Sequence, residues 1–174
     1  MDPNLHRRDL LRLFTAAALA PTLQLSAAEP GAPLFFSKDE FELLDTITDL
    51  VIPTDYHSPG ARAAGVAAFI DRTVAEAFLP ESKTSWRNGL ASIDELSQST
   101  SHRAFVKASN HQQTVLLKKL AAKEKNPQTE AEKFFTQLKE TTAFAYYTSK
   151  IGIHEDMGYL GNTIQEQFSG YEVT

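Results

Sequence analysis

Apolar residues recur every three or four positions through most of this 174-residue chain. This spacing places them on one side of an α-helix. No run of four or more residues alternates convincingly at the period of two that a half-buried strand requires. The pattern therefore predicts an all-α fold, an irregular bundle of about five helices over residues 37–150. A long glycine- and aromatic-rich tail, residues 151–174, follows it.

Capping residues and prolines set the expected helix boundaries. The first helix begins at Ser37, which forms a capping box with Glu40, and it ends before Pro53. The others are expected at about 65–78, 83–97, 109–123 (opened by a capping box at Ser109) and 129–150. The side chains expected to face the core are Phe41, Leu44, Ile47, Leu50, Val51, Val66, Phe69, Ile70, Val74, Phe78, Trp86, Leu90, Ile93, Leu96, Val115, Leu116, Leu117, Leu120, Phe134, Phe135, Leu138, Thr142, Ala145 and Tyr146.

The first 28 residues have the composition of an export signal. Arg7 and Arg8 precede a weakly apolar run over 13–20, and small residues follow at 26–28. Paired arginines before such a run are typical of the twin-arginine route, which carries folded proteins, so we expect a periplasmic or otherwise exported location. The run is shorter than the roughly 20 residues of a membrane-spanning helix. A signal for unfolded export and an uncleaved weak anchor remain as alternatives.

The amino-acid composition excludes several kinds of site and partner for this chain. The chain has no cysteine, which excludes disulfides, iron–sulfur clusters, thiolate zinc sites and covalently attached haem. Its formal net charge of −5 argues against nucleic acid and anionic lipid as partners, so any membrane association is expected to be indirect. Residues 29–36 hold two prolines and a glycine and are expected to form an extended linker.

A search for catalytic and metal-binding patterns gives only weak candidates. No Glu-x-x-His pair, phosphate loop or dinucleotide turn occurs, and His154-Glu155 lacks the second histidine of a zinc-protease helix. Asp55 and His57 share the 53–59 loop, where a turn-forming role is the alternative to a site. Asp45 and Asp49 form either a carboxylate pair or a solvated helix face. We therefore predict no catalytic, cofactor-binding or metal-binding residue in this chain.

Two segments are candidates for contact with a partner protein. The first has small residues at helical spacing, namely Pro59, Gly60, Ala61, Ala64 and Gly65, and its alternative is packing within the domain. The second lies in the tail, where aromatic residues and glycines are unlike the rest of the chain. A surface turn over 158–163 is its alternative. The tail residues selected are Tyr159, Gly161, Asn162, Phe168 and Tyr171.

These segments resemble the small (third) subunit of membrane-associated gluconate 2-dehydrogenase. The resemblance covers about residues 37–171 and is most specific at 52–55, 58–61, 65–66, 69–71, 147–149 and 158–162. It differs in one respect, since relatives often have a cysteine near the C-terminus where this chain has Tyr171.

The resemblance implies a noncatalytic subunit that stabilises a large FAD-dependent sugar or sugar-acid dehydrogenase of the glucose–methanol–choline type. The FAD belongs to that partner, which often lacks a signal of its own and is exported on the signal of the small subunit. A multihaem cytochrome c commonly receives the electrons, which leaves open whether this complex has one. The alternatives from the residues themselves are a free-standing exported helical binding domain and an enzyme using Asp55, His57 or His154.

Overall fold

The computed structural model describes residues 32–159 and 161. Within this part of the chain every regular element is helical, which confirms the all-α irregular bundle. The elements, in chain order, are α2 (Lys38–Val51), α3 (Gly60–Ala63), α4 (Val66–Ala75), α5 (Pro80–Ser101), the 3₁₀ turn η1 (Phe105–Lys107), α6 (Asn110–Ala121), α7 (Glu130–Tyr147) and the π-helical turn η2 (Gly152–Asp156).

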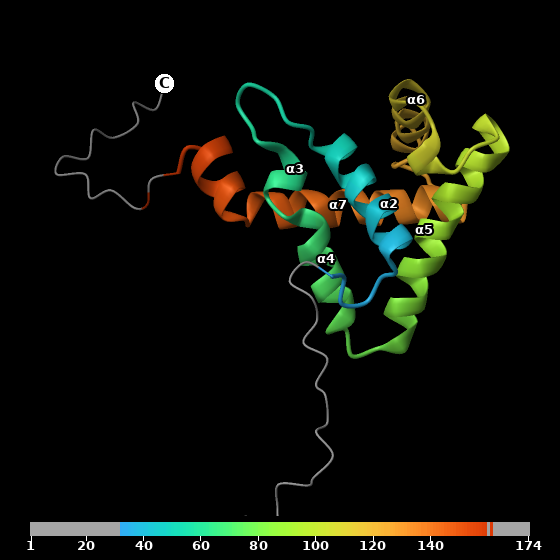
Figure 1. Cartoon of the computed structure of the whole chain (residues 1–174), viewed down its shortest axis with the longest axis horizontal. Helices are drawn as coiled ribbons and strands as arrows, with labels where there is room; N and C mark the ends of the chain where they lie inside the picture. Colours follow the sequence, from blue (N-terminus) through green and yellow to red (C-terminus); the bar gives the residue numbers. More distant parts are fainter. Residues whose placement is uncertain (1–31, 160, 162–174) are drawn as a thin grey trace, which may run out of the picture. The chain divides into compact units, whose positions relative to one another are not determined.

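Helix α7 runs through the middle of the bundle. In Figure 1, α5 and α6 lie beside its N-terminal half, and α4 lies beside its C-terminal half. Its inward side holds the residues predicted to face the core and one further alanine. These buried residues are Ala131, Phe134, Phe135, Leu138, Thr142, Ala145 and Tyr146. The three- and four-residue spacing of this set explains why the segment is a helix that all the other long helices contact.

Capping boxes begin three of the helices. Those predicted at Ser37 and Ser109 are confirmed, since each side chain accepts from the third residue of its helix and the reciprocal bond is present. Thr129 opens α7 in the same way through Glu132. Each box satisfies two backbone N–H groups that a helix N-terminus leaves without an acceptor. Local sequence therefore fixes where α2, α6 and α7 start.

A buried carboxylate holds the segment that leads into α2. Asp71 of α4 accepts hydrogen bonds from the backbone N–H groups of Leu34, Phe35 and Phe36. Arg87 of α5 donates to the Phe35 carbonyl at 3.0 Å and lies over its ring. As predicted, residues 32–36 contain no helix, but they are fixed against α4 and α5 as they enter the bundle.

Three residues expected in the core lie at the surface instead. Helix α4 ends at Ala75 and the next helix starts at Pro80, so Phe78 lies in the connection between them and is 95% exposed. On α4, Val66, Ala67, Ile70, Asp71 and Val74 form the buried side, which turns Phe69 outward. Val115 is exposed because Gln113, Leu116, Leu117 and Leu120 occupy the inward side of α6. Helix α5 is also longer than predicted at both ends.

Candidate partner-binding surface

Asp55 and His57 belong to a hydrogen-bonded turn. The Asp55 carboxylate accepts from the backbone N–H groups of His57 and Ser58, each at 2.8 Å. These two bonds lower the pKa of Asp55. The His57 ring lies against Tyr56 with ring centroids 3.8 Å apart, and all three side chains are exposed. The loop therefore matches the turn-forming alternative, with the carboxylate used by the loop's own backbone.

The pair Asp45 and Asp49 shares a single guanidinium. Arg62 of α3 approaches Asp45 at 2.8 Å and Asp49 at 3.2 Å. The hydrogen bond to Asp45, with the negative charges of both carboxylates, raises the pKa of Arg62. The two carboxylates thus join α2 to α3 at the surface through this shared ion pair.

Part of the small-residue segment packs within the chain. Gly60 has a φ of +81°, and a Cβ placed there would lie 2.7 Å from the backbone nitrogen of Thr54. Ala61 is fully buried and donates its N–H to the Ile52 carbonyl at 2.9 Å. The predicted alternative of packing within the domain therefore holds for Gly60 and Ala61. Their small size allows the 53–59 loop to close over α3.

The rest of that segment is accessible. Gly65 is exposed with a φ of +69°, and no atom lies within 4 Å of the position its Cβ would take. Pro59 and Ala64 are partly exposed. Pro59, Ala64 and Gly65 are therefore accessible to a partner protein. Gly60 and Ala61 are buried next to them in the sequence.

An exposed aromatic group lies where α4 meets α7. Phe69 of α4 is 42% exposed, and Phe144 and Tyr147 of α7 are 61% and 46% exposed. The rings of Phe69 and Phe144 have centroids 6.3 Å apart. We call Phe69, Phe144 and Tyr147 the aromatic surface. Sequence analysis placed Phe69 in the core and did not select the other two. The sequence feature that could have indicated them is the absence of charged side chains over residues 141–149.

The described chain continues beyond α7 through η2. Gly152 lies so close to the α7 backbone that a Cβ there would be 2.1 Å from the Tyr146 carbonyl oxygen. His154 bonds through Nδ1 to the Tyr159 carbonyl at 2.8 Å, and Met157 and Tyr159 are exposed. Gly161 is exposed with a φ of +100°. The predicted residues Asn162, Phe168 and Tyr171, like Arg7 and Arg8, lie outside the described residues.

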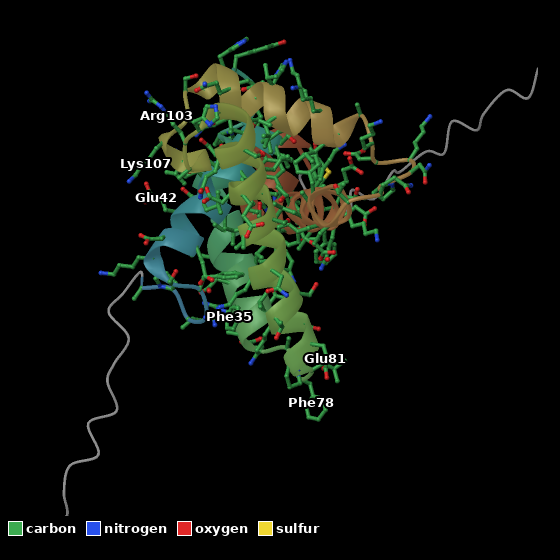
Figure 2. All side chains as sticks on the ribbon, turned by 90° about the vertical axis from the view of Figure 1, so that its right-hand side faces the viewer. Phe35, Glu42, Phe78, Glu81, Arg103 and Lys107 are labelled. Atoms are coloured by element: carbon green, nitrogen blue, oxygen red, sulfur yellow. The ribbon has the colours of Figure 1, made fainter. Side chains whose placement is uncertain are left out.

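A groove of about 550 Å³ separates α2, α5 and η1. Glu42 and Lys107 lie on the same side of the molecule in Figure 2 and line this groove. Inside it, Asp94 accepts from the Phe105 N–H at 2.7 Å, and Glu40 pairs with Arg87. The polar groups at its walls therefore hold the three elements together.

A metal site or a membrane-spanning helix among the described residues would change the expected chemistry of the chain. Among residues 32–159 and 161, no group of three or more acidic or histidine side chains is placed to hold a metal ion. Within the same residues, no helix combines the length and apolar character needed to cross a bilayer.

Comparison with known proteins gives one match. Residues 38–163 match the protein family described as gluconate 2-dehydrogenase subunit 3. No curated protein and no solved structure matches the chain.

Proposed function

The chain belongs to the gluconate 2-dehydrogenase subunit 3 family, and from this membership we propose that it is the noncatalytic small subunit of an exported FAD-dependent dehydrogenase complex. In this proposal the large subunit is a glucose–methanol–choline type flavoprotein that oxidises a sugar or sugar acid. The small subunit stabilises that flavoprotein and supplies its signal for folded export to the periplasm.

The single observation that carries the proposal is the family match over residues 38–163. It spans every helix of the described bundle, from the start of α2 to the end of η2. The family description names a subunit, which indicates a multi-subunit dehydrogenase complex. A cofactor held by another chain of that complex agrees with the turn-forming role of Asp55 and with the ion pairing of Asp45 and Asp49.

The proposed interface includes the accessible residues selected from the sequence. Pro59, Ala64 and Gly65 are exposed or partly exposed beside α4, and Tyr159 and Gly161 are exposed beyond η2. We also include Asn162 and the aromatic residues Phe168 and Tyr171 in the proposed interface. Aromatic residues such as these are enriched where interfaces concentrate their binding energy.

Coexpression of the full chain with its FAD-dependent large subunit tests the proposal. We expect the large subunit to be flavin-loaded and exported only when this chain is present. Replacing both signal arginines, Arg7→Lys with Arg8→Lys, is the matched control, because it is expected to leave the flavin-loaded complex in the cytoplasm. A large subunit that is loaded and exported equally well without this chain would contradict the proposal.

A further inference from the structure

The outward side of α7 changes character along the helix. Its first part, 130–140, has five charged residues, namely Glu130, Glu132, Lys133, Lys139 and Glu140. Residues 141–149 have none, and this uncharged part contains Phe144 and Tyr147 of the aromatic surface. Charged residues are depleted and aromatic residues enriched at the centres of protein interfaces. The second part of α7 therefore has the composition of an interface centre.

The threonine hydroxyls near the aromatic surface already donate hydrogen bonds to helix carbonyls. Thr73 donates its hydroxyl to the Phe69 carbonyl at 2.8 Å, and Thr148 donates to the Phe144 carbonyl at 2.7 Å. Thr141 bonds in the same way to Gln137 at 2.8 Å. Covering these threonines leaves no hydroxyl donor without an acceptor, so the usual cost of burying a polar side chain is small here.

On α4, small side chains flank the aromatic surface. Gly65 and Ala68 are exposed next to Phe69, and open space lies above Gly65. Since these side chains are minimal, the backbone of another protein can approach α4 closely while its apolar side chains contact the two phenylalanine rings. At the other end, α7 leads through η2 to exposed Met157 and Tyr159, and the sequence continues with Phe168 and Tyr171.

We propose that the aromatic surface, flanked by Gly65 and Ala68, is where the large flavoprotein subunit docks. The inference rests on the proposed function, which supplies a large protein partner for this chain. The occupant is an apolar patch on that subunit, because the centre of the surface has no charge to pair. Binding through it is therefore expected to depend little on salt concentration.

A double variant with a matched control tests the site. Phe69→Ser with Phe144→Ser removes both rings of the aromatic surface. Phe78→Ser removes a ring that is still more exposed, at 95%, in the connection between α4 and α5, and Figure 2 shows it projecting away from the bundle. Each full-length chain is coexpressed with the large subunit, and the complex retained is quantified. We expect the double variant to lose affinity by about tenfold or more and Phe78→Ser to bind like the wild type. Far-UV circular dichroism checks that each variant is folded.

Hydrogen exchange of the wild-type complex gives a second measurement that needs no variant. We expect amides over 65–73 and 141–149 to exchange more slowly in the complex than in the isolated chain. Amides of the α2–α5–η1 groove are expected to be unchanged. Protection confined to that groove would overturn the inference.

The possible results distinguish a failure of the proposed docking surface from a failure of the proposed function. Failure of the wild-type chain to retain the large subunit would reject the proposed function, and the inference with it. Retention by the double variant at wild-type strength, or an equal loss in Phe78→Ser, would reject the aromatic surface alone. A dimer of the isolated chain that the double variant abolishes would also overturn it, by assigning the surface to a second copy.

Discussion

Phe134 and Phe144 lie on the same helix, yet Phe134 is 3% exposed and Phe144 is 61% exposed. In the first half of α7 the Phe134 ring packs edge-on against Trp86, with centroids 5.3 Å apart, and directly over Gly89 of α5. The outward side of that half is charged. In the second half Phe144 lies on the outward side, and its ring lies near that of Phe69, with centroids 6.3 Å apart.

One helix therefore uses phenylalanine in two ways, buried in the core at Phe134 and exposed at Phe144. Its inward side is continuous from Ala131 to Tyr146 and holds the bundle together. Its outward side is charged where nothing is expected to cover it and uncharged where we place a partner. The buried side of α7 therefore stabilises the fold. The change from charged to uncharged residues on its outward side indicates where we expect a partner to bind.

The largest effect is expected from the same substitution made in each half. Phe134→Ala leaves a cavity beside Trp86 and Gly89 and is expected to lower the free energy of unfolding by about 3–5 kcal/mol. Phe144→Ala removes a mostly solvated ring and is expected to cost less than about 1 kcal/mol. Urea denaturation followed by circular dichroism measures both. Equal losses would mean that Phe144 contributes to the core as Phe134 does, and that the two halves of α7 do not differ in this way.

Two glycines next to α7 give the next largest effect. A Cβ at Gly89 would lie 2.0 Å from the Phe134 ring, and one at Gly152 would lie 2.1 Å from the Tyr146 carbonyl oxygen. Gly89→Ala is expected to destabilise the whole bundle by about 1–3 kcal/mol, because the ring is held in the core. Gly152→Ala is expected mainly to open η2, seen as faster hydrogen exchange over 148–157. An equal loss of unfolding free energy in both variants would mean that η2 unfolds together with the core, which would contradict the expectation.

Much of the first half of α7 could be predicted from the sequence. Phe134, Phe135 and Leu138 follow helical spacing, and local patterns predicted the caps at Ser37 and Ser109. The buried role of Asp71 could not be predicted in this way, because the N–H groups it binds come from residues 34–36 and meet it only in the folded chain.

The aromatic surface shows why helical spacing alone does not locate a site. Consecutive residues point about 100° apart on a helix, so at the edge of the buried side one residue faces the core while the next does not, as with Tyr146 and Tyr147. The sequence does not say where the boundary of the buried side falls. Packing of α4 on α7 decides it, burying Tyr146 and Ile70 and leaving Tyr147 and Phe69 outside.

A smaller effect is expected from the hydroxyl of Tyr146 in the second half. This buried hydroxyl forms a short hydrogen bond with Ser58 Oγ, which also accepts from the Gly60 N–H. Tyr146→Phe is expected to cost about 0.5–1.5 kcal/mol of unfolding free energy, the usual net value of one hydrogen bond. Tyr147→Phe is the control at the neighbouring exposed ring and is expected to leave the unfolding midpoint unchanged. A larger loss in Tyr147→Phe would place that hydroxyl, and not that of Tyr146, in the fold.

The smallest effect is expected from the charge at the start of α7. Backbone N–H groups of Gln128 and Thr129 donate to Glu132 and lower its pKa. Since the folded pKa lies below the unfolded one, the stabilisation from Glu132 is present above its ordinary pKa of 4.5 and is lost as the pH falls through the lowered value. Glu132→Gln is therefore expected to be less stable than the wild type at neutral pH, and the gap is expected to close below pH 4.5. Thermal unfolding across this range measures the gap, and Glu140→Gln controls for the change in net charge. An equal gap in both variants would attribute the effect to net charge, because only Glu132 binds the backbone amides that precede the helix.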